Sequence, residues 1–133
     1  MLLTPVVWED APVIEKLPES SGNILGFRIR GKLTEADYRD FLDPEMEKAM
    51  KEYPKIRVVW FMEGFEGWTV GGAWEDFLLG MKFSAVEKMA TVIDESWDEW
   101  LTLMFKAFTT LTRTELRFFK KERLAEAWEW IRA

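Results

Sequence analysis

The chain has 133 residues, of which 48% are apolar and 32% are charged, and this fits one soluble globular domain with a sizeable core. It contains no histidine and no cysteine, which excludes catalytic triads, thiol chemistry, the usual zinc ligand sets and haem or iron–sulfur ligation through these residues. Its net charge of −6 argues against nucleic acid as a partner, because binding to a phosphate backbone needs clustered lysine and arginine.

The aromatic content is high, with 8 tryptophans and 10 phenylalanines. A core of this size rarely needs so many large rings. We therefore expect some of them to line a pocket or an interface.

Residues 1–12 are expected to form an irregular N-terminal segment, and residues 13–133 a single domain. The first residues are apolar but too short for a signal peptide, and they lack a basic flank. No apolar run reaches the length of a membrane-spanning helix. The expectation is a cytoplasmic protein.

The N-terminal half begins with two alternating segments, 13–17 and 24–31, joined by turn residues, which predict an antiparallel hairpin. Apolar residues at helical spacing then predict a helix over 38–53, with Thr34 as its N-cap. The pair Asp43-Pro44 interrupts this helix. It predicts either a kink or a second start in which Asp43 is the cap.

The rest of the chain alternates strands and helices. Residues 56–62 are apolar on both faces, as in a central strand covered by helices on both sides. Ser96, with Glu99 three positions on, predicts a capping box that starts a later helix. The remaining expected elements are a helical stripe over 70–81, a strand over 88–94, an apolar helix face over 97–108 widened by Leu103 and Leu111, a strand over 115–120 and a last helix over 124–131.

This order predicts an α/β fold with about four helices. Strands that alternate with helices favour a mostly parallel mixed sheet of four to five strands with right-handed crossovers. The initial hairpin should add one antiparallel edge strand. Ligands in such sheets usually bind beyond the carboxyl ends of the strands, where the glycine-rich segment 63–77 falls.

Segment 63–77 reads EGFEGWTVGGAWEDF. It lacks the lysine and the spacing of a P-loop and does not match G-x-G-x-x-G. Thr69 could cap the following helix, and the amides near Gly71 and Gly72 would then form an anion site. Thr69 itself is a candidate phosphosite. The alternative is a tight turn at Gly64 and Gly67. The carboxylates around the loop match no metal ligand set, and no metal or cofactor is predicted.

Two segments rich in aromatic rings and methionine give the candidate binding residues. Two such helices can enclose an apolar pocket or form a dimer contact, but they can equally be plain core. The candidate wall consists of Trp68, Trp74, Phe77, Met81, Trp97, Trp100, Leu101, Met104, Phe105 and Phe108.

The chain resembles the SpoIIAA-like branch of the STAS superfamily, also described as STAS/SEC14-like, over about residues 13 to 132. The resemblance rests on NILGFRIRGKLTEADYRDFLDPEMEKAM, KIRVVWFMEGFEGWTVGGAWEDFLLGMKF, WDEWLTLMFKAF and ELRFFKKERLAEAWEWI. It implies a STAS-like sheet of four to five strands. It also implies a protein-interaction module, since STAS domains include anti-anti-sigma factors.

Those factors carry a phosphorylatable serine in an Asp-Ser-Ser-Gly segment after the third strand. The matching segment here is 67–72, and Thr69 is its nearest hydroxyl. The SEC14-like comparison implies an apolar or lipid-like ligand instead. The leading interpretation is a non-catalytic module that binds itself, a regulatory protein or such a ligand; the alternatives are a phosphoswitch through Thr69 and an enzyme of unknown reaction.

Overall fold

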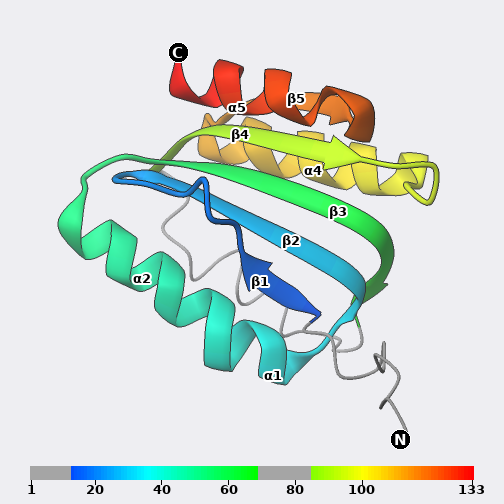
Figure 1. Ribbon diagram of the computed structural model, residues 1–133, viewed down its shortest axis with the longest axis horizontal. Coiled ribbons are helices and arrows are strands. Elements are labelled where there is room, and N and C mark those ends of the chain that lie inside the picture. The colour runs from blue at the N-terminus through cyan, green and yellow to red at the C-terminus, as the bar shows by residue number, and fades with distance from the viewer. Residues whose placement is uncertain (1–12, 69–84) are drawn as a thin grey trace, which may run out of the picture.

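A computed structural model describes residues 13–68 and 85–133 of the chain. Its sheet has five strands in chain order: β1 (Ile14–Lys16), β2 (Ile24–Leu33), β3 (Ile56–Trp68), β4 (Val86–Ile93) and β5 (Glu115–Lys120). The first pair is antiparallel and the other three pairs are parallel. The predicted mostly parallel sheet with one antiparallel edge strand is therefore confirmed (Figure 1).

Helices cover both faces of this sheet. The longer ones are α2 (Asp43–Glu52), α4 (Glu99–Thr112) and α5 (Leu124–Arg132), with a short α1 (Glu35–Asp37) and a 3₁₀ turn at Lys121–Arg123. Figure 1 shows α2 and α5 on opposite sides of the strands. The helix expected over 70–81 lies outside the described residues.

Two apolar layers hold the helices on the sheet. Phe27, Ile29, Val58 and Trp60 meet α2 and α4 in the first layer, which also contains Leu42, Met46, Leu101 and Phe105. In the second layer, Val59, Phe61, Ala90 and Val92 meet Ala127, Trp128 and Ile131 of α5. Consecutive parallel strands with right-handed crossovers place their connecting helices on one face, and α5 closes the other. This confirms that the apolar segment 56–62 is covered on both sides.

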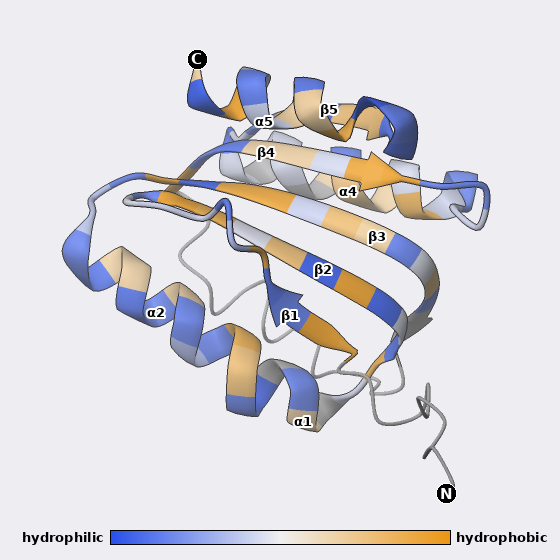
Figure 2. Ribbon diagram, in the orientation of Figure 1, coloured by the Kyte–Doolittle hydropathy of each residue, from blue (hydrophilic) through white to orange (hydrophobic). Residues whose placement is uncertain are grey.

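The alternation of β2 separates core from surface. Phe27 and Ile29 are fully buried, whereas Arg28 and Arg30, which alternate with them, point to the face that carries α5. Figure 2 shows this alternation as apolar and polar bands along β2. Because α5 packs over β3, β4 and β5, the polar bands of β2 lie beside it and stay partly accessible.

β3 continues through residues that were predicted as a loop. Gly64 does not form a tight turn. It lies inside the strand with a φ of +60°. Gly31 of β2 has the same φ and lies where the register between the two strands shifts. Residues in this left-handed conformation form bulges that bend a pair of strands, and glycine adopts the conformation without strain. The bulge lets β3 run on to Trp68, paired with Leu33.

The start of the first helical segment is partly as predicted. Thr34 is the cap, since its Oγ accepts from Asp37 N (3.2 Å) while the Asp37 carboxylate accepts from Thr34 N (2.9 Å). The proline interruption becomes a π-helical turn at Tyr38–Leu42 that leads into α2. Asp43 is not a cap: Leu42 holds that position in helical conformation, and Asp43-Pro44 form the first turn, where the missing N–H costs nothing.

The predicted capping box at Ser96 is wrong. Asp98 caps α4 by accepting from Trp100 N at 2.9 Å, and the helix starts at Glu99. Ser96 instead donates its backbone N–H to Asp94 at 3.0 Å. Asp94 lies two residues before Ser96 in the same turn and offers a charged acceptor. Ser96 therefore bonds to Asp94 instead of capping the helix.

Candidate functional site

The rings on the inner side of α4 form a cluster with the sheet. Trp97 lies 5.5 Å from Phe105 and 6.0 Å from Phe118, ring centroid to centroid, and 6.3 Å from Phe65 of β3. Its indole N–H donates to Thr102 Oγ1 at 2.7 Å, which satisfies its one polar atom. Phe65 and Phe105 are buried and Trp97 is partly buried. These residues therefore pack as core within the described part of the chain.

The outer side of α4 has a different character. Trp100 and Leu103 lie one turn apart and are 59% and 66% exposed. They are the large apolar side chains that stand most exposed among the described residues. Leu103 was expected on the apolar face with Leu101, but the structure places it opposite, because residues two positions apart lie about 200° apart around an α-helix.

The predicted wall residues thus divide into three groups. Leu101 and Phe105 are buried, Trp97 and Met104 pack partly buried against the same core cluster, and Trp100 points outward. The structure brings the first four together, whereas Trp100 is exposed. Trp74, Phe77, Met81, Thr69, Gly71 and Gly72 lie outside the described residues, as do the side chains of Trp68 and Phe108.

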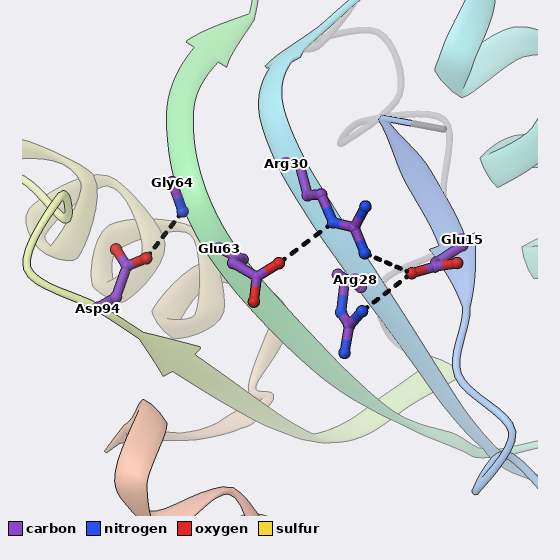
Figure 3. Close-up of polar contacts among 6 residues, drawn as sticks. All are labelled: Glu15, Arg28, Arg30, Glu63, Gly64 and Asp94. Carbon is purple, nitrogen blue, oxygen red and sulfur yellow. Dashed lines mark hydrogen bonds and ion pairs between the residues drawn. The ribbon is translucent and has the colours of Figure 1, made fainter. Parts of the chain in front are cut away.

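A hydrogen-bonded turn after β4 contacts the bulge in β3 (Figure 3). The Asp94 carboxylate accepts from Gly64 N at 2.8 Å and from Ser96 N at 3.0 Å. Burial of this carboxyl opposes its ionisation, but hydrogen bonds from Ser96 and Gly64 and the charge of Lys121 outweigh burial and lower the pKa of Asp94. The ionised carboxylate is therefore a fixed structural acceptor at the bulge.

A charged network occupies the uncovered part of the sheet face (Figure 3). Glu15 Oε1 lies 3.2 Å from Arg28 Nη1 and 3.1 Å from Arg30 Nη2, and Arg30 Nε lies 3.1 Å from Glu63. The Arg28 guanidinium also stacks over Phe61 at 5.3 Å. Sequence reasoning missed this network; the alternation of Arg28 and Arg30 with the buried residues of β2 was its only signal.

Two hollows lie beside β5. The larger, about 640 Å³, is lined by Arg117, Phe118, Phe119, Lys120, Glu122, Arg123 and Glu126. The smaller, about 330 Å³, lies past the carboxyl ends of β4 and β5, where Lys121 pairs with Glu95 at 3.2 Å. Both mix cationic and anionic side chains, so neither presents a single charge to a ligand.

The described ranges contain no cluster of three or more acidic residues placed to hold a metal ion. Nor do they contain a helix with the length and apolar character needed to cross a membrane.

Comparison with known proteins gives a consistent match. A family model described as SpoIIAA-like matches residues 24–132. A solved structure of an uncharacterized protein of the DUF3478 family, with a SpoIIAA-like fold, from Shewanella loihica PV-4, is 26% identical, with a TM-score of 0.64. The match covers 89% of this chain and 93% of that one. A search of curated proteins gives no significant match.

Proposed function

This chain belongs to the SpoIIAA-like family, and we propose that its STAS-type domain is a non-catalytic interaction module that binds protein through the outer face of α4. The observation that carries the proposal is the exposure of Trp100 and Leu103 on one side of that helix. Exposed tryptophan is enriched at binding interfaces because it buries a large area with little loss of rotamer freedom.

The surface extends along the helix. Ala107 and Thr110 are also exposed and continue the line of Trp100 and Leu103 towards the C-terminus of α4. A stripe of this length fits the face of another helix or a shallow groove. The outer faces of α2 and α5, by contrast, carry mainly charged side chains.

Site-specific photocrosslinking in cells tests the interaction module. We expect a benzophenone amino acid at position 107 to give a discrete adduct that disappears when Leu103→Asp is added. The matched control places the same amino acid at Lys48, which is exposed on α2. Equal crosslinking at both positions, or adducts at 107 that persist in the Leu103→Asp protein, would contradict the proposal.

A small apolar or lipid-like ligand is the second candidate, supported by the high aromatic content of the chain, with 8 tryptophans and 10 phenylalanines. For this role the wall would include Trp68, Trp74 and Phe77 as well. Native mass spectrometry of gently purified protein should then show a bound lipid, and added fatty acid should change tryptophan fluorescence. Absence of both signals rules the ligand out.

A further inference from the structure

The exposed stripe of α4 has the spacing of a coiled-coil seam. Trp100, Leu103, Ala107 and Thr110 follow one another at intervals of three, four and three residues, and all are exposed. This is the a and d pattern through which two helices pack along their length. Met104, partly buried on one flank of the stripe, adds apolar area there.

The other flank of the stripe is charged. Glu99 and Lys106 lie on it, and Arg113, the left-handed C-cap that follows the last helical residue, comes seven residues after Lys106; all three are exposed. Among the described residues, neither Glu99 nor Arg113 makes an ion pair. They are about 21 Å apart along one helix, at 1.5 Å per residue, so they cannot neutralise each other within one chain.

We propose, on the basis of the interaction module above, that the partner of this surface is a second copy of the chain, with the two α4 helices antiparallel about a twofold axis. This arrangement sets Leu103 against the partner's Ala107 and Trp100 against the partner's Thr110. It also brings Glu99 beside the partner's Arg113, and the symmetry forms this pair twice.

The charges select the antiparallel orientation. A parallel pair would place Glu99 near the partner's Met104 and would leave Arg113 without an acidic neighbour. Lys106 lies nearest the twofold axis, where it faces the partner's Lys106. Its long side chain can extend into solvent, and Lys106→Gln is expected to tighten the dimer by removing this repulsion. One helix pair makes a small interface, so the dimer is weak, in about the micromolar range.

Charge reversal gives a sharp test by sedimentation velocity over a range of concentrations. Glu99→Arg and Arg113→Glu should each weaken dimerisation about tenfold or more, because each homodimer then holds two like-charged pairs. A mixture of the two variants should dimerise again, since the heterodimer contains two complementary pairs. The double variant Glu99→Arg/Arg113→Glu should also recover. Glu52→Arg and Lys48→Glu, exposed on α2, make the same charge changes as controls and should leave dimerisation unchanged.

The outcomes separate this inference from the interaction module. A native protein that stays monomeric at several hundred micromolar overturns self-association, while crosslinking at position 107 still decides whether α4 binds another protein. If Leu103→Asp abolishes the dimer but neither charge reversal weakens it, α4 remains the interface and the antiparallel pairing is wrong. A dimer that also survives Leu103→Asp overturns the interface itself. Circular dichroism confirms that each variant is folded.

Discussion

The carboxylate of Asp94 and the backbone N–H of Gly64 lie 2.8 Å apart, and this hydrogen bond holds the end of β4 against the bulge in β3 (Figure 3). β4 pairs with β3 only as far as Phe61 and Val92. Beyond that point β3 has no neighbouring strand on this side among the described residues. Asp94 therefore satisfies an amide of β3 that lies beyond the last residue paired with β4.

Replacement of Asp94 by asparagine should lower the free energy of unfolding by about 1 kcal/mol near neutral pH, because a partly exposed, charged hydrogen bond is lost. The pKa of Asp94 is lowered on folding, so its contribution is fully present above the unfolded pKa, near ~3.9, and is lost as pH falls through the folded pKa. Urea unfolding at several pH values measures this. If the difference in unfolding free energy between the native protein and the variant stays constant at acid pH, the role of the ionised Asp94 carboxylate is contradicted.

Replacement of Gly26 by alanine should destabilise the fold by about 1–3 kcal/mol through overpacking. A Cβ at this position would lie 2.4 Å from Cη2 and 2.7 Å from Cζ2 of Trp128, which packs on β2 from α5. The double variant with Trp128→Leu should lose less than the sum of the two single changes, since the smaller side chain makes room. Additive losses in a denaturation cycle would show that the two residues do not clash.

Replacement of Glu15 by glutamine should cost about 0.5–1 kcal/mol, because one carboxylate joins Arg28 and Arg30 across β1 and β2 at a partly exposed site. High salt should shrink the difference from the native protein, since mobile ions screen exposed charges. Chemical denaturation by urea, with and without added salt, measures both values. A difference that is independent of salt would mean that the loss comes from packing and not from charge.

Replacement of Trp97 by leucine should cost about 2–4 kcal/mol, because three ring contacts and the hydrogen bond to Thr102 disappear together. Leu103→Ala on α4, the helix that follows Trp97, is the control. It should change stability by less than about 0.5 kcal/mol in dilute protein, since that side chain is 66% exposed. Equal losses for the two variants would contradict the packing of α4 described above.

The local patterns of the sequence were enough to predict the types of elements and their order. The hairpin of 13–17 and 24–31 and the doubly apolar segment 56–62 predicted the antiparallel edge and the centre of the sheet, and both are confirmed. These patterns work because the period of two in a strand and the period of 3.6 in a helix are properties of the backbone itself. The chain order favoured a mostly parallel sheet with right-handed crossovers, and the structure adds that strands consecutive in the chain are neighbours in the sheet.

Only the tertiary structure decided which individual side chains are buried and which are exposed. Trp97 and Trp100 both looked like wall residues, yet one packs among rings of the core and the other stands outside. Trp97 lies before α4, which is capped by Asp98 and begins at Glu99, and its ring packs against Phe105 and Phe118, whereas Trp100 lies on the outer side of the helix. The bulge at Gly64 likewise depends on Gly31 of the neighbouring strand. The packing of Trp97 and the bulge at Gly64 depend on contacts between segments far apart in the chain, which no local pattern records.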